Sequence, residues 1–571
     1  MKRISDILKN YIDMAIVDAG FTLPLRTYSL DQPELSLHGH YATNVALTLS
    51  KDANVSPKDC AQKLIESLVI KNHKEIAKVE LAGPGFINIF LSNGAIEEYV
   101  SEYQDNFEVF PARNESVLCE YTDPNCFKSF HVGHLMANTI GEAVSRLYAM
   151  AGYEVTRVCY PSDIGRNVAM GVWGVMQRKD QIPDGSVSLR EKALFLGDCY
   201  ADANKSFETS EQAKEDIIKV NQAIYAGSDE EVMRIYNLGR KWSLDYFDEL
   251  YKMLGTTFNN FIYESEVSEP GIKIVREFLK KGLFEESEGA IVYKGEQDGL
   301  HTRVFINQKG LPTYEAKDLG NYEKKLELLP KASFYVVVTA NEQNEYFKVV
   351  NTVAKKIHSE LEGRLVHIGH GLMRLPEGKM SSREGNVIEA EDLIGTVKEK
   401  VKEKMSDLIL GDDEKENVIK DIAIGAIKFS ILKQAPGKDT IFDIEKSISF
   451  EGDSGPYLQY THARICALLS KAETLGIKRN LSSVGERQVE LERAIIIYAD
   501  IVEKATKELA PQHIVNYLLT LTRAFNSMYG SQMILDINNK ESEYYLALAN
   551  ATKEIIAHGL NTLGIASPER M

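Results

Sequence analysis

The segment Val117-Leu118-Cys119-Glu120-Tyr121, followed after a loop by His131-Val132-Gly133-His134, decides the fold that this sequence predicts. The first stretch is an apolar run of strand length, and Thr122 to Phe130 is rich in turn-forming residues. From Leu135 to Met150 apolar residues recur at helical spacing, so both histidines fall on the first helical turn. They share a face there, and the amide groups at a helix N-terminus attract phosphate. The segment therefore predicts a strand, a loop and a helix that begins with a phosphate site.

A second stretch, Lys379-Met380-Ser381-Ser382-Arg383, lies far downstream between glycines. Its two cations can fold over leaving phosphates, where fixed positive charge stabilises the charge that develops in a transition state. At the first stretch, Gly133 lets a base or a ribose lie against bare backbone. Together the two stretches predict a split ATP site, with ATP as a substrate.

Composition places the chain among soluble proteins of several domains. It has 571 residues, 44% hydrophobic and 26% charged, and its longest apolar runs are much shorter than the ~20 residues of a membrane span. The N-terminal residues fit an amphipathic surface helix and not a signal peptide. The six cysteines contain no C-x-x-C pair, which is typical of a reducing compartment, so we expect a cytoplasmic protein without a membrane partner.

The net charge of −17 argues against a general nucleic-acid coat, although a local basic track can still bind RNA. A zinc site made of Cys119, Cys126, His131 and His134 is the alternative use of the histidines. The two cysteines are too far apart for the usual ligand spacing, and Cys119 lies inside the apolar strand. We therefore expect buried thiols and no metal site.

Three zones follow one another along the chain: a small α+β module over residues 1–110, a parallel α/β sheet over 111–450 with a helical insertion at about 178–252, and an all-α bundle over 451–571. In the first zone we expect a helix from Ile4, an alternating segment around Tyr41 to Leu49, a helix near Pro57 to Ile70, and strands at Ile76–Leu81 and Phe86–Leu91. In the second we expect strands at Val117–Tyr121, Val155–Val158, Ile291–Tyr293, Phe334–Val338 and Leu365–Ile368. In the bundle the expected helical stripes are Leu491 to Ala505, Ile514 to Met528, and Leu548 to Leu563.

Several segments, in order, resemble the arginyl-tRNA synthetases, a family of class I aminoacyl-tRNA synthetases, over essentially the whole chain. They are Ala82 to Asn88, Glu120 to Asn125 running into His131–His134, Lys309 to Asp318, Ser449 to Arg464, and Ser567 to Met571. The resemblance implies a Rossmann-type catalytic domain with the loop 379–383, an N-terminal domain that binds the tRNA elbow, and a C-terminal anticodon-binding bundle. It also implies ATP-dependent activation of arginine, transfer to tRNA(Arg), and activation that waits for tRNA.

The resemblance assigns site residues by position. For arginine they are Glu120, Asn125, Tyr314, Asp318 and Gln343. For ATP they are His131, Gly133, His134, Lys379, Met380, Ser381 and Ser382, and for catalysis His131, His134, Lys379, Arg383 and Lys128. For tRNA they are Tyr460, Arg464 and Asn44. The arginine set suits its ligand, because a planar, charged guanidinium with five donors needs carboxylates and a flat wall. We expect no metal held by protein ligands, Mg²⁺ carried by ATP, and a monomer.

Some positions depart from the family pattern, and some alternatives stay open. Ser382 stands where a lysine is common, Met136 where arginine is frequent, Ser162–Arg166 replaces a G-D-W-G element, and His40 takes the place of an aspartate. A glutamyl or glutaminyl synthetase would share the ATP motifs but would need a different pocket from Glu120 and Asp318. A small nucleotidyltransferase would lack the bundle, and a non-catalytic tRNA-binding paralogue would have lost Lys379 or a histidine.

Overall fold

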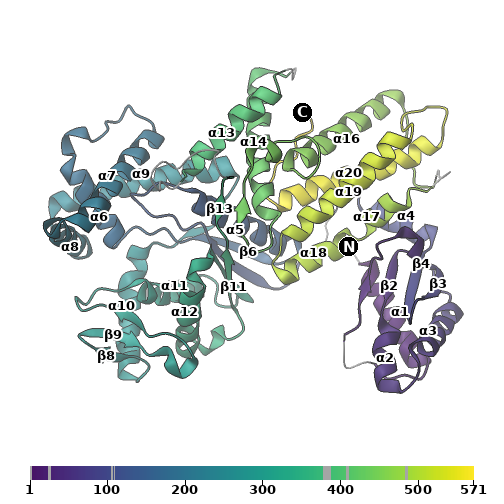
Figure 1. The fold of residues 1–571 in the computed structure, drawn as a ribbon, viewed down its shortest axis with the longest axis horizontal. Coiled ribbons are helices and arrows are strands. Elements are labelled where there is room, and N and C mark those ends of the chain that lie inside the picture. Colours follow the sequence, from purple (N-terminus) through teal and green to yellow (C-terminus); the bar gives the residue numbers. More distant parts are fainter. Residues whose placement is uncertain are drawn as a thin grey trace. The chain divides into compact units, whose positions relative to one another are not determined.

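A computed structural model of the chain describes residues 3–23, 27–104, 107, 110–376, 388–406, 410–482 and 487–571 (Figure 1). The five residues of the predicted loop, Lys379 to Arg383, lie outside the described residues. The chain forms two compact units. The first contains Met1–Pro111, Leu408–Ile422 and Ser449–Met571, and the second contains Ala112–Asp407 and Ala423–Ile448. Among the described helices, none is long and apolar enough to cross a membrane.

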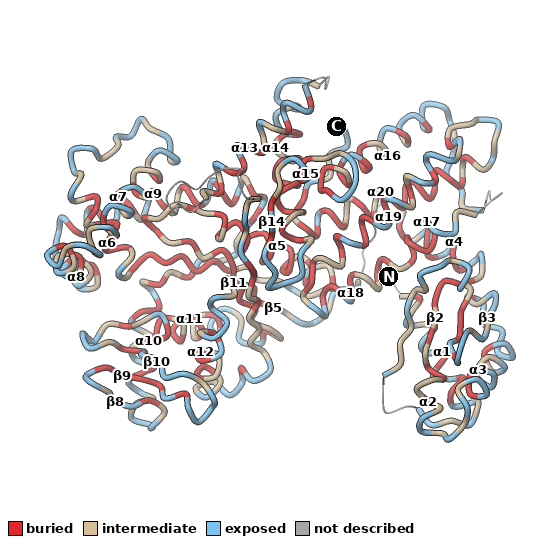
Figure 2. The backbone as a smooth tube through the Cα atoms, viewed as in Figure 1, coloured by how far each residue is buried: buried red, intermediate tan, exposed pale blue. Residues whose placement is uncertain are grey.

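The second unit is built on a five-stranded parallel sheet in the order β12-β11-β5-β6-β7. The strands are β5 (Ser116–Tyr121), β6 (Glu154–Cys159), β7 (Asn260–Phe261), β11 (Phe334–Ala340) and β12 (Leu365–His370). Val117–Tyr121 of β5 and Tyr335–Val338 of β11 are continuously buried, red in Figure 2, because helices cover both faces of a parallel sheet. The predicted parallel α/β fold is confirmed.

The order of these strands reverses between β5 and β11. From β5 the chain runs through α5 (Val132–Met150) to β6 on one side, whereas from β11 it runs through α12 (Asn344–Ile357) to β12 on the other. In open α/β sheets ligands bind at the carboxyl ends of the strands at such a switch point. The residues that follow Tyr121 and Ala340 therefore mark the expected site.

The prediction that Ile291–Tyr293 belongs to this parallel sheet is wrong. Ile291–Tyr293 lies in β9 (Ala290–Tyr293), which pairs antiparallel with β8 (Glu285–Ser287) and β10 (Arg303–Ile306) in a separate sheet. The turn Glu288-Gly289 joins β8 to β9 with φ of +50° and +79°. Two residues with positive φ form a tight hairpin turn, whereas a parallel pair needs a long crossover.

Helices make up most of the rest of the second unit. The insertion contains α7 (Leu189–Thr209), α8 (Glu211–Ala226) and α9 (Glu230–Leu254), packed beside α6 (Arg166–Gln177). Between β7 and β11 lie α10 (Glu264–Lys280) and α11 (Tyr314–Leu328). After β12 come β13 (Met373–Arg374), α13 (Ala390–Lys404), α14 (Asp412–Leu432), β14 (Thr440–Ile441) and α15 (Ile444–Ser447). The part of α14 as far as Ile422 belongs to the first unit.

The N-terminal part of the first unit is an antiparallel sheet in the order β1-β2-β4-β3, with helices packed on it. Its elements are α1 (Ile4–Asp18), β1 (Leu30–Asp31), β2 (Tyr41–Thr43), α2 (Val45–Ala53), α3 (Pro57–Lys71), β3 (Ile76–Ala82), β4 (Phe86–Leu91) and α4 (Asn93–Glu102). The alternating segment is a strand only as far as Thr43. From there Val45, Ala46 and Leu49 are buried at helical spacing, so the apolar residues serve a helix.

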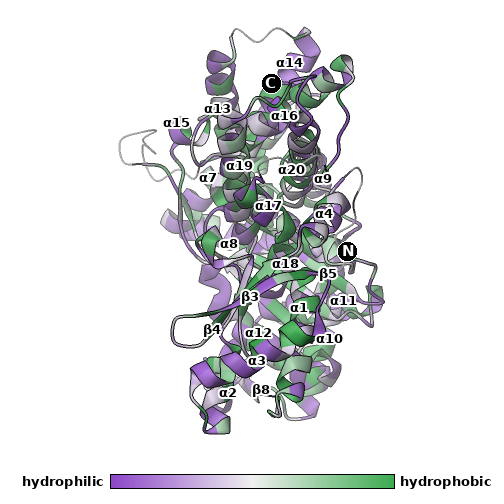
Figure 3. Ribbon diagram, turned by 90° about the vertical axis from the view of Figure 1, so that its right-hand side faces the viewer, coloured by the Kyte–Doolittle hydropathy of each residue, from purple (hydrophilic) through white to green (hydrophobic). Residues whose placement is uncertain are grey.

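The C-terminal part of the first unit is the predicted helical bundle. It contains α16 (Gly455–Leu475), α17 (Val489–Ile496), α18 (Tyr498–Glu508), α19 (Gln512–Ser531) and α20 (Glu541–Thr562). Apolar residues of α19 and α20, green in Figure 3, are buried in its core. The stripe from Leu491 to Ala505 is divided between two helices, because the chain leaves regular helix at Ile497, where φ is −87° and ψ is −1°.

Candidate active site

His131 and His134 cap the first turn of α5 together. The backbone N–H of Gly133 donates to His131 Nδ1 at 3.1 Å, and the backbone N–H of His131 donates to His134 Nδ1 at 3.3 Å. The two rings stack with centroids 3.9 Å apart and an interplanar angle of 21°. This reciprocal arrangement is a capping box made of imidazoles, and it satisfies backbone donors that a helix start leaves unpaired.

Both histidines are neutral at physiological pH. Burial lowers the pKa of His131 to about 4, with Lys128 adding to the effect. Burial also lowers the pKa of His134 well below its usual value, helped by His131, Lys128 and His370. Since each Nδ1 accepts a hydrogen bond, each neutral ring carries its proton on Nε2. The pair can therefore offer phosphate hydrogen-bond donors, but not the positive charge of an imidazolium.

Gly133 is required by this geometry. A Cβ at Gly133 would lie 2.8 Å from His131 Cε1 and 2.9 Å from Nδ1, so any side chain would displace the capping ring. The histidine segment also pairs with the chain that follows the loop 379–383. The N–H of Val132 donates to the carbonyl of Ile388 at 3.0 Å, and that of Ala390 donates to the carbonyl of Phe130 at 3.0 Å. Residues 388–390, which follow that loop in the sequence, are thus hydrogen-bonded to the histidine segment.

The loop between β5 and α5 holds unusual backbone. Thr122, Asp123 and Phe127 have φ of +85°, +43° and +64°, a region that β-branched and bulky residues rarely adopt. Such conformations concentrate at functional sites, where the surrounding structure enforces them. Lys128 lies in this loop with Nζ 4.6 Å from the ring centre of Tyr200, so its charge faces the helical insertion in addition to lying near the histidines.

A cluster of carboxylates lies at the carboxyl end of β5. It contains Glu120 on β5, Asp123 in the following loop and Asp318 on α11. Burial raises the pKa of Asp318 to about 7, and Glu120 adds to this, while the Tyr346 hydroxyl, which donates to Asp318 at 2.6 Å, opposes it. Burial, Glu120 and Asp318 also raise the pKa of Asp123, although its Oδ1 accepts from Tyr160 N at 2.7 Å. Burial thus raises the pKa of both aspartates, and the neighbouring carboxylates add to the effect, as expected where acids are buried close together.

Two side chains of α11 contact Glu120. Lys325 Nζ lies 3.0 Å from Glu120 Oε2, and Asn321 Nδ2 donates to the same oxygen at 2.8 Å. Glu120 and Lys325 are both buried. One lysine therefore compensates part of the charge of three acids. The sequence singled out Glu120 and Asp318 but missed Asp123, Lys325 and Tyr346.

The other three arginine-site candidates lie at the same edge of the sheet or close to it. Tyr314 begins α11, is 49% exposed and accepts from Asn167 Nδ2 at 3.2 Å. Lys317 Nζ lies 4.4 Å from the centre of the Tyr314 ring. Asn125 is half-buried and bridges to Ser162 after β6, and Gln343 is exposed in the turn after β11. Among the described residues of the second unit, each predicted site residue thus lies at or after the carboxyl end of β5 or β11, or on α11.

The element Ser162–Arg166, which departs from the family pattern, also has a structural role. Asp163 is fully buried and accepts from the backbone N–H of Ser265 at 2.9 Å, from the Ser265 hydroxyl at 2.7 Å and from Arg240 Nε at 2.7 Å. These bonds join the start of α10 to α9. No sequence pattern indicates this role of Asp163, because its partners lie far away in the sequence.

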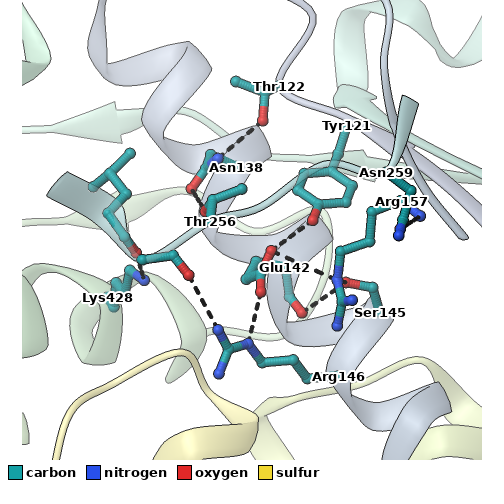
Figure 4. Close-up of polar contacts among 12 residues, drawn as sticks. Tyr121, Thr122, Asn138, Glu142, Ser145, Arg146, Arg157, Thr256, Asn259 and Lys428 are labelled. Carbon is teal, nitrogen blue, oxygen red and sulfur yellow. Dashed lines mark hydrogen bonds and ion pairs between the residues drawn. The ribbon is translucent and has the colours of Figure 1, made fainter. Parts of the chain in front are cut away.

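A buried polar network fixes α5 against β5 (Figure 4). Glu142 accepts from the Tyr121 hydroxyl at 2.6 Å and from Arg146 Nε at 2.7 Å, with Arg157 Nε 3.9 Å away. Lys428 Nζ donates to the carbonyl of Leu254 at 2.6 Å, and burial lowers its pKa to about 8. Because Tyr121 ends β5, this network fixes the position of α5, which begins at the histidines, relative to the acid cluster.

We expect Tyr121→Phe to destabilise the second unit by about 1.5–3 kcal/mol, the range for a hydrogen bond to a charged group. The phenol donates to a buried carboxylate, which would keep only its cationic partners. Calorimetric melting measures the loss. Tyr148→Phe is the matched control, because Tyr148 on α5 is buried, as Tyr121 on β5 is. Equal melting temperatures of the two variants would show that the Tyr121–Glu142 bond contributes nothing.

The tRNA-site candidates lie in the first unit. Tyr460 is 36% exposed on α16, and the Arg464 guanidinium lies 4.8 Å from its ring centre and 5.3 Å from that of Tyr529. Arg464 Nη1 also donates to Asn526 Oδ1 at 3.1 Å. Asn44 instead accepts from the backbone N–H of Ser29 at 2.8 Å, which ties the segment before β1 to α2. Tyr460, Arg464 and Tyr529 thus form a preorganised surface, whereas the observed contact of Asn44 is structural.

The fold and these motifs define a class I tRNA synthetase. The family model for the catalytic domain of "tRNA synthetases class I (R)" matches residues 100–444, a DALR anticodon binding domain matches 458–571, and an arginyl tRNA synthetase N terminal domain matches 6–91. The chain belongs to the arginyl-tRNA synthetase family, as the resemblance predicted.

Similar proteins agree with this membership. An arginine--tRNA ligase of Parabacteroides distasonis is 29% identical over 573 residues, covering 95% of each chain. That of Archaeoglobus fulgidus is 28% identical over 557 residues, covering 94% of this chain and 96% of its own. The solved structure of Thermus thermophilus arginyl-tRNA synthetase has a TM-score of 0.83 at 24% identity, with complete coverage of both chains. That of the Plasmodium falciparum enzyme has a TM-score of 0.80 at 20% identity, also with complete coverage of both. At such identities the structures show the fold alone.

Proposed function

We propose that this chain is an arginine–tRNA ligase that works in two steps. In the first, the arginine carboxylate attacks the α-phosphate of ATP, forming arginyl-adenylate and releasing pyrophosphate. In the second, a terminal ribose hydroxyl of tRNA(Arg) attacks the adenylate carbonyl, forming arginyl-tRNA and releasing AMP. The observation that carries the proposal is the acid cluster of Glu120, Asp123 and Asp318, which lies at the switch point of a class I fold.

This cluster suits arginine and not glutamate or glutamine. A guanidinium is a permanent planar cation, and it relieves the mutual repulsion of carboxylates that burial has already made unfavourable. Tyr314 can supply a flat wall, and Asn125 and Gln343 can receive the α-amino group. A substrate with a side-chain carboxylate would add a further negative charge to the same place. The pocket therefore disfavours glutamate by its charge. It disfavours glutamine because a neutral amide would leave the charge of the buried acids uncompensated.

The proposed ATP site begins with His131, Gly133 and His134. Their neutral Nε2–H groups would donate to phosphate oxygens, and alignment together with fixed donors would lower the barrier without a protein nucleophile. Lys379, Met380, Ser381, Ser382 and Arg383, together with Lys128, complete the proposed phosphate-binding set. ATP would enter with its Mg²⁺ as the substrate complex.

The remaining proposals concern tRNA and the state of the protein. Tyr460 and Arg464 would contact the anticodon loop, and Asn44 the tRNA elbow. We assign residues 1–110, 111–450 and 451–571 to elbow binding, catalysis and anticodon binding. The six free cysteines support a cytoplasmic location. Light scattering tests the proposed monomer.

Amino-acid-dependent exchange of pyrophosphate into ATP, run over twenty amino acids with and without tRNA, tests the function. Exchange that depends on arginine alone supports the proposal. Exchange that depends on another amino acid would refute the proposal. So would the absence of exchange with all twenty amino acids when tRNA(Arg) is present. The two conditions also separate a synthetase that activates arginine freely from one that waits for tRNA.

We expect Asp318→Asn to raise the arginine KM about tenfold to a hundredfold, because it removes a charge-assisted hydrogen bond that contributes ~1.5–3 kcal/mol to binding. The wild-type arginine KM should also rise as pH falls below about 7, because Asp318 takes up a proton there and loses its charge. The titratable groups that interact with Asp318 are Glu120, Asp123, Glu264, Lys325, Tyr160, Tyr322 and Tyr346. Asp318→Asn should lose this part of the pH dependence.

The ATP KM serves as the internal reference for this experiment, and Asp248→Asn, an exposed acid on α9, is the matched control. An unchanged arginine KM in folded Asp318→Asn would remove Asp318 from the pocket. An arginine KM of the wild type that is constant between pH 6 and 8 would show that Asp318 is already ionised there.

A further inference from the structure

One face of α11 carries four polar side chains that bear on the acid cluster. Tyr314, Asp318, Asn321 and Lys325 are spaced by four, three and four residues, the spacing that places helical side chains in one row. Tyr314 and Asp318 are the arginine-site candidates of this row. Asn321 and Lys325 continue it by nearly two turns and reach Glu120 instead.

The contacts to Glu120 are concentrated on one of its oxygens. Lys325 Nζ at 3.0 Å and Asn321 Nδ2 at 2.8 Å both meet Oε2. Lys325 is 2% exposed and Glu120 is 3% exposed, so the ion pair is screened from water. Lys325 Nζ also lies 4.7 Å from the centre of the Tyr322 ring, which limits where the ammonium can move.

Stability alone does not account for this arrangement. A buried ion pair recovers its desolvation cost poorly, and apolar residues of similar volume often serve a fold as well or better. Asn321 carries a second cost. With Nδ2 turned to Glu120, its Oδ1 is buried and has no hydrogen-bond partner among the described residues. An unsatisfied buried acceptor lowers the stability of the fold, so the contact of Asn321 with Glu120 is made although Oδ1 has no hydrogen bond.

We propose that Lys325 is a positioning residue for arginine binding: it holds Glu120 by Oε2, with Asn321, and leaves Oε1 to receive the substrate guanidinium. This inference rests on the proposed function. Lys325 itself touches neither substrate nor reacting atoms. It acts through the geometry of Glu120 and through its charge among the three acids.

The charge has its own effect. Lys325 lowers the pKa of Asp123 and of Asp318, against burial and Glu120, which raise them. The acids and phenols around these two carboxyls are Glu120 on β5, Glu264 on α10, Tyr160 after β6, Tyr251 on α9, Tyr322 on α11 and Tyr346 on α12. Without Lys325, a larger fraction of Asp123 and Asp318 is protonated at neutral pH, and the pocket attracts a guanidinium less.

The test compares Lys325→Met with Lys325→Arg in arginine-dependent pyrophosphate exchange, with tRNA present. We expect Lys325→Met to raise the arginine KM about tenfold at pH 7.5, to move its pH profile about one unit upward, and to leave the ATP KM unchanged. Lys325→Arg keeps the charge and should keep the wild-type profile. Lys324→Met is the matched control, because Lys324 is its exposed neighbour on α11 and pairs with Glu327.

Each remaining outcome has a definite meaning. If Lys325→Met folds and keeps the wild-type arginine KM and profile, the inference is overturned. If Lys325→Met lowers kcat and raises the ATP KM as much as it raises the arginine KM, the role of Lys325 is structural. The inference is then also overturned. Should Lys325→Met fail to fold, Asn321→Leu provides the test: it must raise the arginine KM without moving the pH profile, and an unchanged KM overturns the inference. Failure of the wild type to exchange with arginine would instead refute the proposed function.

Discussion

His134→Asn is expected to slow adenylate formation by about 10²–10³-fold, the usual cost of removing one preorganised donor to a developing charge. An asparagine oxygen can replace Nδ1 as the acceptor for the N–H of His131, so the start of α5 should stay capped. What is lost is the Nε2–H group, the proposed donor to phosphate. Because such a donor acts mainly in the transition state, kcat should fall while arginine binding changes little.

Single-turnover formation of adenylate measures this effect, and His134→Gln is the matched comparison. A glutamine amide reaches the region of Nε2 but abandons the cap, so it should retain more activity and less stability than asparagine. The reverse order, with an active Asn variant and an inactive Gln variant, would give His134 a structural role only. Since the pKa of His131 is about 4, ionisation of this ring should not contribute to the pH profile above pH 5.

Local pattern was sufficient for most of the fold. The run Val117–Tyr121 and the helical spacing after His131 predict β5 and α5, and the glycine within the motif fits its close approach to the His131 ring. The spacing of apolar residues along the chain indicates which face of a helix or strand is buried, and it depends only on residues close in the sequence. It does not indicate the partner of a strand. That is why Ile291–Tyr293 was placed in the parallel sheet although it belongs to a hairpin.

The site was predicted only in part for a related reason. The family resemblance assigned Glu120 and Asp318 to the arginine pocket, and in the structure Glu120 is close enough to raise the pKa of Asp318. Asp123 was passed over because it stands in a turn-rich loop, where an aspartate has an ordinary explanation. Lys325 on α11 contacts Glu120 on β5, and Tyr346 on α12 contacts Asp318 on α11. The partners in each contact lie on different elements, so no spacing rule predicts either pair. The loop from Lys379 to Arg383 stays a prediction.

The exposed cluster of Tyr460, Arg464 and Tyr529 is the proposed contact for the anticodon loop. Two partly exposed rings flank one guanidinium, and Asn526 fixes its orientation. Aromatic and guanidinium planes held in this way can stack an unpaired base, and the charge can contact phosphate. Because the rings are already ordered, little entropy would be lost when RNA binds.

Replacing Tyr460 and Arg464 together by alanine should therefore weaken tRNA binding by ~2–4 kcal/mol, with ~1–3 for stacking and the rest for a charge contact. Filter binding at one fixed salt concentration measures the Kd, and Lys507→Ala on α18 controls for the loss of one exposed charge. The melting temperature should change little, because Tyr460 is 36% exposed and a surface cation contributes weakly to stability. An unaltered tRNA Kd would return both residues to the bundle surface. A collapse of the melting temperature would mean that the pair holds α16 to α19 through Asn526, and that tRNA binding was lost with the fold.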